Sequence, residues 1–217
     1  MIEVYLLNLT DSLEEPVEKF LHYFTIKRQE KILSYKFTAD RNRTIWAELL
    51  ARSIVAKKMS RTIEETRIER DLNGKPYVID SNLKISLAHS KNWAACSIGE
   101  IASGIDVEED FVDELTLAEF FFTTQEYREL CKLKGWSRAE KFLSIWTIKE
   151  SFAKLTGRNL DDALTIESAE ILSVSNPIAG KNFFLDKSVV GVCTERSALP
   201  ENFTCIPATK NFKELIC

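Results

Sequence analysis

One short stretch, GIDVEED at 104–110, constrains the fold more than any other part of the sequence. Its alternation is that of a β-strand, so Ile105 and Val107 face one side and Asp106 and Glu108 face the other. Two carboxylates side by side on one face of a strand repel each other. The face that carries them must therefore be hydrated or lie against something cationic.

The pattern of apolar residues around this stretch predicts a mixed α and β fold. The predicted helices cover 13–24, 40–59, 114–120, 124–134 and 138–156. The predicted strands cover 2–8, 83–90, 93–98, 104–108, 164–171, 182–185, 188–194 and 203–207, and another short strand follows the NGKP turn at 73–76. Because the order of a strand, helices and further strands occurs twice, we expect two half-domains, 1–102 and 103–217.

Charge is distributed unevenly along the chain. Residues 19–61 hold eleven basic and three acidic side chains, although the net charge of the whole chain is −4. A local basic block in an acidic protein suits a compact anionic ligand better than a long nucleic acid. The chain also lacks an aromatic stacking platform beside this block, so we expect no nucleic-acid partner.

The first residues lack the basic segment of a secretory signal, and acidic residues interrupt them early. No apolar run approaches the roughly 18 residues of a membrane helix. The five cysteines are scattered, without the paired spacing of a zinc site. We therefore expect a cytoplasmic protein with no membrane partner.

The segment IWTIKESFAKLTG at 145–157 predicts a helix on which Glu150 and Lys154 share one side. A glutamate four residues before a lysine is also a common surface pair, worth about 0.2–0.5 kcal/mol. Glu150 could instead complete a set of oxygen ligands with Asp106 and Glu108, which is what Mg²⁺ (or Mn²⁺) prefers. A divalent cation held there would explain why two carboxylates stand together on one strand.

A histidine stands where another strand is predicted to end. His89 shares a strand face with Ile85 and Leu87, and Ser90 follows it. A lone histidine most often makes a structural hydrogen bond. At the end of a strand it can also donate to a phosphate, so both interpretations remain open.

Taken together, these motifs resemble the signature of the Sfp-type 4′-phosphopantetheinyl transferase family. That signature runs roughly G-[IV]-D-x-E and then W-x-x-K-E-[SA]-x-x-K. The chain carries each signature residue: Gly104, Asp106, Glu108, Trp146, Lys149, Glu150 and Lys154. The stretches EKILSYKFTADRNRT, NGKPYV, AHSKNW and EFFFTTQEY also resemble family elements in the family's order. The similarity extends to about residue 165.

The resemblance implies an α+β fold of two similar α/β half-domains related by pseudo-twofold symmetry, with coenzyme A between them. The N-terminal half would bind the nucleotide, and the C-terminal half would hold Mg²⁺ and dock the carrier protein. The implied metal ligands are Asp106, Glu108 and Glu150. The implied catalytic residues are Glu150 and Lys154. The implied cofactor-binding residues are Arg28, Lys31, Arg43, Thr44, Lys75, Pro76, His89, Ser90 and Lys154.

The implied activity is transfer of 4′-phosphopantetheine from coenzyme A to a serine hydroxyl of an acyl or peptidyl carrier protein, with release of adenosine 3′,5′-bisphosphate. The resemblance also implies a monomer. We expect the carrier to dock near Phe111 and Leu115, together with part of Phe120–Phe122, of which Phe121 and Phe122 are expected in the core.

The chain departs from the family pattern at two positions. Ala88 stands before His89 where the family usually has serine, so one side-chain contact to the cofactor is absent. Asn159 stands where the family usually has a second glycine after the long helix. The first departure predicts weaker binding of coenzyme A rather than loss of the chemistry.

Two other functions fit the same residues. One is a catalytically impaired module of the same fold that binds coenzyme A or another nucleotide without turnover. The other is a Mg²⁺-dependent phosphohydrolase that uses the same three carboxylates and needs no carrier protein.

Overall fold

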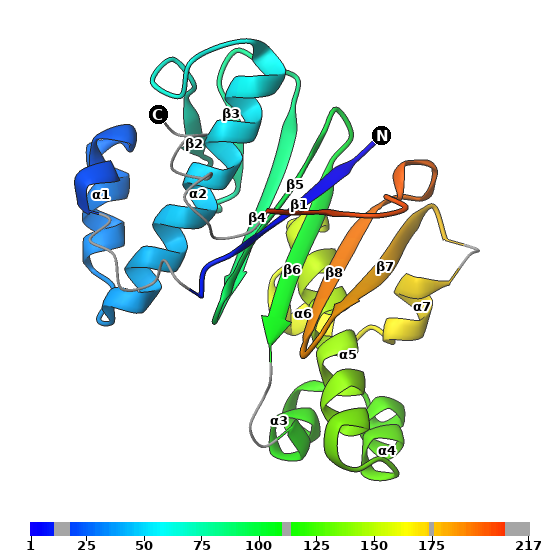
Figure 1. The fold of residues 1–217 in the computed structure, drawn as a ribbon. Helices are drawn as coiled ribbons and strands as arrows, with labels where there is room; N and C mark the ends of the chain where they lie inside the picture. Colours follow the sequence, from blue (N-terminus) through cyan, green and yellow to red (C-terminus); the bar gives the residue numbers. More distant parts are fainter. Residues whose placement is uncertain (11–17, 110–113, 174–175, 207–217) are drawn as a thin grey trace.

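The computed structural model describes residues 1–10, 18–109, 114–173 and 176–206. The first half of the chain forms one long helix, shorter helical segments and five strands (Figure 1). These elements are β1 (Glu3–Asn8), the 3₁₀ helix η1 (Glu18–Tyr23), α1 (Ile26–Leu33), α2 (Thr38–Met59), β2 (Ile68–Arg70), β3 (Pro76–Val78), β4 (Lys84–Ser90) and β5 (Trp93–Gly99).

The second half repeats this combination of one long helix and an antiparallel sheet. Its elements are β6 (Ser103–Glu109), α3 (Glu114–Phe121), α4 (Thr124–Cys131), α5 (Gly135–Thr156), α6 (Leu160–Leu164), α7 (Ser168–Leu172), β7 (Ile178–Leu185), β8 (Ser188–Glu195), the 3₁₀ helix η2 (Arg196–Ala198) and β9 (Thr204–Ile206). Both long helices, α2 and α5, have 22 residues. The predicted α+β class is confirmed, and the pseudo-twofold relation between the halves stays a prediction.

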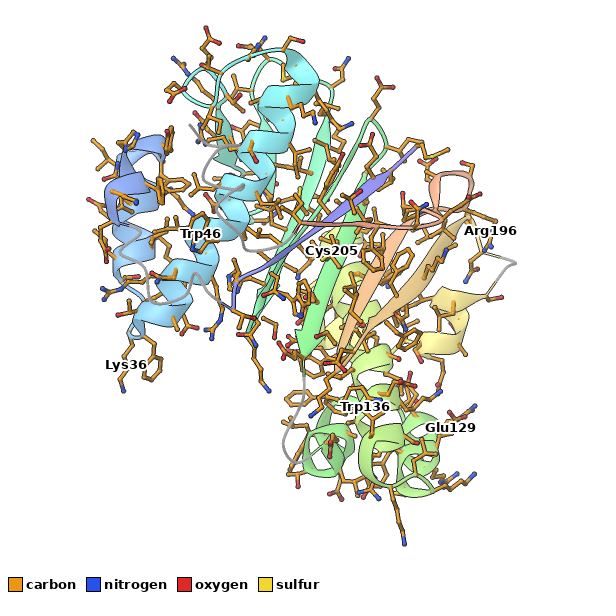
Figure 2. The ribbon with its side chains drawn as sticks, in the orientation of Figure 1. Lys36, Trp46, Glu129, Trp136, Arg196 and Cys205 are labelled. Carbon is orange, nitrogen blue, oxygen red and sulfur yellow. The ribbon has the colours of Figure 1, made fainter. Side chains whose placement is uncertain are left out.

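The strands form two sheets. The larger has the order β2-β3-β4-β5-β1-β9, and the smaller has the order β6-β8-β7. β9 runs parallel to β1, with Cys205 opposite Leu6, so the chain returns from the second half to the sheet of the first (Figure 2). All other pairings in the two sheets are antiparallel.

Helix α2 covers one face of the larger sheet (Figure 1). The apolar stripe that the sequence predicted on this helix is buried: Ile45, Trp46, Leu49, Leu50, Ser53 and Ile54 are each at most 8% exposed. The five apolar residues among them pack with Leu7, Ile85 and Cys96 of the sheet into one core. Burial of such a stripe, rather than helix propensity, is the main source of stability for a helix of this kind.

Helix α5 lies unusually close to the smaller sheet. A Cβ atom placed on Gly104 of β6 would lie 1.8 Å from the carbonyl oxygen of Ser151. One placed on Gly191 of β8 would lie 2.5 Å from the carbonyl oxygen of Thr147. Both positions therefore require glycine because the helix backbone itself occupies the space of a side chain.

A second core joins the two sheets. It combines Val4, Leu6 and Ala95 of the larger sheet with Ile105 and Val192 of the smaller one. Two polar contacts reinforce the junction. The hydroxyl of Ser86 accepts the Ile105 N–H at 3.2 Å, and the hydroxyls of Ser97 and Ser103 lie 2.8 Å apart. β4 is thereby held beside β6, which fixes the position of one half on the other.

One predicted strand is wrong. Residues 164–171 do not form a strand, because α6 ends at Leu164 and α7 begins at Ser168. Leu164 on α6 and Ile171 on α7 are both buried against α5, and the Asn159 side chain accepts the Asp162 N–H and so begins α6. The sequence analysis also missed α1. Of the helix predicted at 13–24, residues 18–23 are a 3₁₀ helix and 13–17 lie outside the described residues.

Among the residues that the structure describes, no helix is long and apolar enough to cross a membrane.

The close approach of α5 to β6 predicts unequal effects of two glycine substitutions. Gly104→Ala places a methyl group against the rigid backbone of α5, so we expect a loss of about 3 kcal/mol or more in the free energy of unfolding. Gly180→Ala is the matched control. Its Cβ would meet only side chains, those of Ile148 at 2.5 Å and Ile171 at 3.1 Å, and we expect a loss of about 1 kcal/mol because side chains can shift. Urea unfolding measures both losses, and equal losses would contradict the role given to the α5 backbone.

Candidate active site

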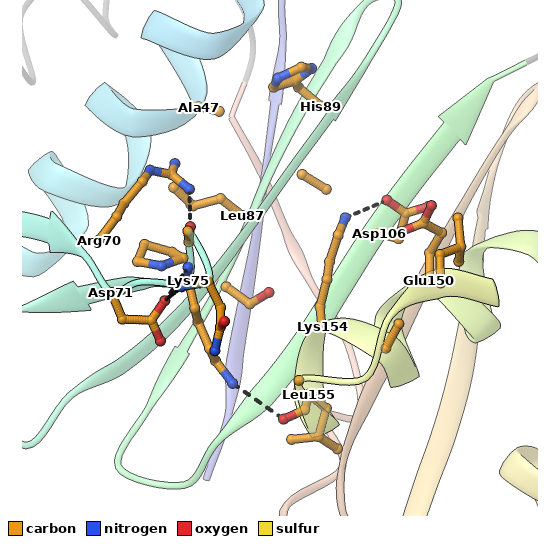
Figure 3. Close-up of a pocket in the computed structure, with 18 of the residues that line it drawn as sticks. Ala47, Arg70, Asp71, Lys75, Leu87, His89, Asp106, Glu150, Lys154 and Leu155 are labelled. Atoms are coloured by element: carbon orange, nitrogen blue, oxygen red, sulfur yellow. Dashed lines mark hydrogen bonds and ion pairs between the residues drawn. The ribbon is translucent and has the colours of Figure 1, made fainter. Parts of the chain in front are cut away.

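A cavity of about 610 Å³ lies between the two halves (Figure 3). Its walls come from α1, α2, β4 and the turn between β2 and β3 on one side, and from β6 and the C-terminal end of α5 on the other. Eight of the residues that the sequence analysis selected line it: Arg28, Thr44, Lys75, Pro76, His89, Asp106, Glu150 and Lys154. Four others, Lys31, Arg43, Ser90 and Glu108, are not among the lining residues.

The acidic end of the cavity is built by one strand and one helix. Asp106 on β6 is 5% exposed, and its Oδ1 accepts a hydrogen bond from the Lys154 ammonium on α5 at 2.7 Å (Figure 3). Glu150 stands one helical turn before Lys154 and also lines the cavity. Glu108, two residues after Asp106, accepts a hydrogen bond from the Ser90 hydroxyl at 2.5 Å.

Burial and mutual repulsion shift the protonation of these acids. Burial raises the pKa of Asp106, although Lys154 opposes the shift. Burial and the charge of Asp106 raise the pKa of Glu108 to about 7, and the same two causes raise the pKa of Glu150. Burial alone would lower the pKa of Lys154, but the neighbouring carboxylates outweigh it and raise that pKa. Perturbed groups that converge in one cavity are typical of a functional site.

The donor set suits a hard divalent cation, although it is not arranged as a closed metal site. Within the described part of the chain, no three histidine, cysteine or acidic side chains form a ready metal cluster. Lys154 and Ser90 each engage one carboxylate oxygen of the predicted set. The Oδ2 atom of Asp106, however, is buried without a hydrogen-bond partner. A buried carboxylate oxygen with no donor is costly unless a cation or a ligand approaches it.

The opposite wall of the cavity carries nitrogen donors. His89 at the end of β4 lies with its Nε2 3.2 Å from the Thr44 hydroxyl on α2. Desolvation by the surrounding protein, together with the charges of Lys154 and Arg43, lowers the pKa of His89 to about 4, although the residue stays exposed to solvent. At neutral pH the ring is therefore neutral and carries one N–H donor.

The two basic residues that do not line the cavity have partners of their own. The Arg43 guanidinium donates to the Lys91 carbonyl at 2.7 Å and pairs with Asp40 at the same distance. The Lys31 ammonium lies 5.6 Å from the centre of the Tyr35 ring. Arg28 does line the cavity, and Glu48 on α2 holds it.

Lys75 spans the cavity between the halves. It follows the turn after β2, and its ammonium donates to the Leu155 carbonyl near the end of α5 at 3.2 Å (Figure 3). The turn itself is held by Asp71, whose Oδ1 accepts the backbone N–H groups of Asn73 and Lys75, each at 2.9 Å. Pro76, the residue after Lys75, begins β3.

Lys149 belongs to the signature but does not reach the cavity. It is fully buried, and its ammonium donates to Glu126 at 2.5 Å and to the Leu164 carbonyl at 2.8 Å. The other oxygen of Glu126 accepts the Ser168 N–H at 2.7 Å. This ion pair therefore joins α4, α5 and α7, and its loss would leave a buried charge unpaired.

Four charged residues of the cavity wall were not predicted from the sequence: Glu48, Arg70, Asp71 and Arg158. One signal was available for Glu48. Thr44, Glu48 and Arg52 recur every four residues on α2, and all three are at most 6% exposed, so the helix buries a polar row beside its apolar stripe. For Arg70, in a three-residue strand, we find no comparable sequence signal.

The raised pKa of Glu108 predicts a pH-dependent cost to stability. Its pKa is about 7 in the folded protein, against an ordinary value of 4.5, so the folded state holds a proton that the unfolded state has released across this range. Stability therefore falls as pH rises from about 4.5 to 7. Glu108→Gln removes the titrating group and keeps an oxygen that accepts from Ser90. We expect the variant to exceed the wild type at about pH 8 by up to about 3 kcal/mol, and at about pH 5 by much less.

Urea unfolding of both proteins across this pH range, without added metal, measures the difference. If the difference in the free energy of unfolding between the two proteins stays constant from about pH 5 to about pH 8, the titration of Glu108 does not cause the predicted loss of stability.

Comparison with known proteins places the chain among enzymes of one kind. Residues 102–204 match the model of the 4′-phosphopantetheinyl transferase superfamily. Residues 13–98 match the model of the 4′-phosphopantetheinyl transferase N-terminal region. The two models meet between β5 and β6, where the chain passes from one half to the other.

Several characterised relatives cover most of the chain. The chain is 25% identical to the 4′-phosphopantetheinyl transferase Sfp of Bacillus subtilis (strain 168) over 215 residues, which is 94% of each chain. It is 26% identical to the transferase psf-1 of Bacillus pumilus over 198 residues, 86% of this chain and 85% of the relative. It is 29% identical to the transferase gsp of Aneurinibacillus migulanus over 161 residues, 74% of this chain and 68% of the relative. The chain belongs to the 4′-phosphopantetheinyl transferase superfamily.

Proposed function

We propose that this protein transfers the 4′-phosphopantetheine group of coenzyme A to a serine hydroxyl of an acyl or peptidyl carrier protein. The observation that carries the proposal is the cavity between the halves, in a chain of this superfamily. One wall has nitrogen donors suited to phosphates, and the other has two acids, Asp106 and Glu150, beside Lys154. A third acid, Glu108, follows two residues after Asp106. Coenzyme A needs both walls, because its pyrophosphate must be held while one of its bonds breaks.

We propose that the N-terminal half binds the nucleotide. His89 and Thr44 offer uncharged donors on one wall, and Arg28 offers a guanidinium beside them. Lys75 and Pro76 would line the adenine, because the turn that carries them forms the adjoining wall. Lys31 and Arg43 are placed outside the lining, so a direct contact with a phosphate requires that their side chains move.

Asp106, Glu108 and Glu150 would hold Mg²⁺ (or Mn²⁺), and the unpartnered Oδ2 of Asp106 supports this assignment. The chemistry that the bound ion supplies is neutralisation of charge on the pyrophosphate. For Asp106 to take this role, Lys154 must turn from its carboxylate toward the substrate. The ammonium is suited to that movement, because its side chain is 32% exposed.

In the transfer step, the serine oxygen of the carrier bonds to the phosphorus that bears pantetheine, and the bond from that phosphorus to the bridging oxygen breaks. Adenosine 3′,5′-bisphosphate leaves with the bond's electron pair. Glu150 would accept the serine proton, a role that its raised pKa favours. Lys154 would donate to the leaving phosphate, so the chain's own residues supply alignment and charge rather than covalent chemistry.

Intact-mass measurement of an apo carrier protein, incubated with this protein, coenzyme A and Mg²⁺, tests the function. We expect the carrier to gain one phosphopantetheine. Glu150→Gln should lower the rate by about 10²-fold or more, because it removes the base and one metal ligand together. Chelation by EDTA should abolish the gain.

The other two functions predict different results in the same assay. A module that only binds would retain coenzyme A without modifying any of several carriers. A phosphohydrolase would release phosphate from a nucleotide when no carrier is present. Either result would overturn the proposed transfer.

The carrier is proposed to dock on α3 and the residues that follow it. Leu115 is half-buried and packs on the core around Phe142, and Phe111 lies outside the described residues. Phe122 is buried as predicted, but Phe121 is 38% exposed, which corrects the prediction for that residue. Phe120 is 76% exposed.

A second cavity of about 570 Å³ lies here, lined in part by Phe120–Phe122 on one side and by Asp161, Leu164 and Thr165 on the other. An exposed aromatic side chain beside a hollow is typical of an anchor in a protein interface.

Phe120→Asp should therefore raise the KM for the carrier about tenfold or more and leave the KM for coenzyme A unchanged, because the substituted side chain lies outside the nucleotide cavity. Phe184→Asp on β7 is the control, since Phe184 is also exposed, at 55%, but lies on another element. Steady-state kinetics with each substrate varied in turn measures both constants. A carrier KM that stays the same in Phe120→Asp, or that rises equally in Phe184→Asp, would exclude this docking surface.

A further inference from the structure

One buried carboxylate holds two arginines at the nucleotide side of the cavity. The side chain of Glu48 is 7% exposed, and its Oε1 accepts from Nε and Nη2 of Arg28, at 2.7 and 2.5 Å. The same oxygen accepts from Nη2 of Arg70 at 2.6 Å. The three residues come from α2, α1 and β2, and all three line the cavity. One carboxylate oxygen of Glu48 therefore links α2 to α1 and to β2.

The charges of this cluster do not balance. One carboxylate can neutralise only one of the two guanidiniums, and both carry a positive charge at any physiological pH. The side chains of Arg28 and Arg70 are 17% and 30% exposed, so neither is fully solvated. Two partly buried like charges that share one counter-ion attract a further anion.

Arg70 also controls the shape of the cavity wall. Its Nη1 donates to the Gly74 carbonyl at 2.7 Å, in the turn that precedes Lys75 (Figure 3). Arg70 therefore connects the fixed carboxylate on α2 to the turn that forms the adjoining wall. A guanidinium suits this task because its planar fork of donors serves two acceptors at once.

The cavity has cationic groups at two separate places. Figure 3 shows Arg70 and Lys154 on opposite sides, with Lys75 between them. A ligand with a single anionic group would satisfy only one of these places. Coenzyme A carries a pyrophosphate and, on its ribose, a separate phosphate monoester. The position of Arg70, far from the acids of β6 and α5, matches the monoester rather than the pyrophosphate.

We propose that Arg70 is a specificity-determining residue that favours substrates with a phosphate monoester on the ribose, and that Glu48 is the positioning residue that holds Arg70 and Arg28 toward the cavity. This inference rests on the proposed use of coenzyme A. His89 and Thr44 offer uncharged donors in the same cavity. Arg70 would add a fixed positive charge, which neither of them supplies.

Binding of coenzyme A and of 3′-dephospho-coenzyme A, measured by calorimetry without any carrier protein, tests the inference. The wild type should bind coenzyme A more tightly. Arg70→Ala should weaken the binding of coenzyme A by about tenfold or more, as for loss of one charge-assisted hydrogen bond, and leave dephospho-coenzyme A nearly unchanged. Glu48→Gln should also reduce the preference for coenzyme A over dephospho-coenzyme A. Arg70→Lys, which keeps the positive charge, should retain part of that preference.

Arg67→Ala is the matched control, because Arg67 is exposed, lies three residues before Arg70 and does not line the cavity. It should leave the ratio of affinities unchanged. Equal weakening of both ligands in Arg70→Ala would mean that Arg70 only shapes the turn, and an equal effect of Arg67→Ala would mean that only general charge matters. Either result overturns the inference. A wild type that binds neither ligand would instead overturn the proposed substrate.

Discussion

The contact of α5 with the backbone of β6 and β8 is the constraint on which the site depends. Gly104 and Gly191 remove the side chains that would otherwise separate helix and sheet. Because the helix backbone lies directly on the strands, Lys154 reaches Asp106 across a single ion pair of 2.7 Å. A helix seated one side chain further away would leave the acids of the strand without the lysine and Glu150. The signature glycine is therefore needed for packing, and the chemistry of the site follows from that packing.

The acidic residues of the site are buried close to one another, an arrangement that does not by itself favour folding. Asp106, Glu108 and Glu150 all have raised pKa values, with burial as the largest cause in each. Such a cluster costs stability in the free protein and favours binding of positive charge. The other side of the cavity shows the opposite imbalance, since Arg28 and Arg70 share the one carboxylate of Glu48. One side of the cavity therefore has an excess of negative charge, and the other has an excess of positive charge. A substrate that carries both phosphates and a metal would neutralise both.

The signature motif combines two different tasks on one helix. Glu150 and Lys154 line the cavity, whereas Lys149 points into the second half and pairs with Glu126. The buried pair joins α4, α5 and the start of α7, and so fixes the rotation of α5 about its axis. That rotation decides which side chains face β6. A motif of adjacent residues thus contains both the groups that line the cavity and the group that orients them.

The sequence by itself determined the strand with its two acids, the two long helices and the spacing that brings Glu150 and Lys154 to one side of α5. These features follow from periodicities of two and 3.6 residues, which are local properties. The strand predicted at 164–171 was wrong because short apolar runs do not distinguish a strand from a buried helix. Asn159 caps α6, which ends at Leu164, and a second short helix, α7, begins at Ser168.

Only the tertiary structure decided that Ser90 donates to Glu108, that Lys149 is buried and that Glu48 joins Arg28 to Arg70. Each of these contacts joins residues that lie on different elements, 18 to 23 positions apart, and local spacing carries no information about such pairs.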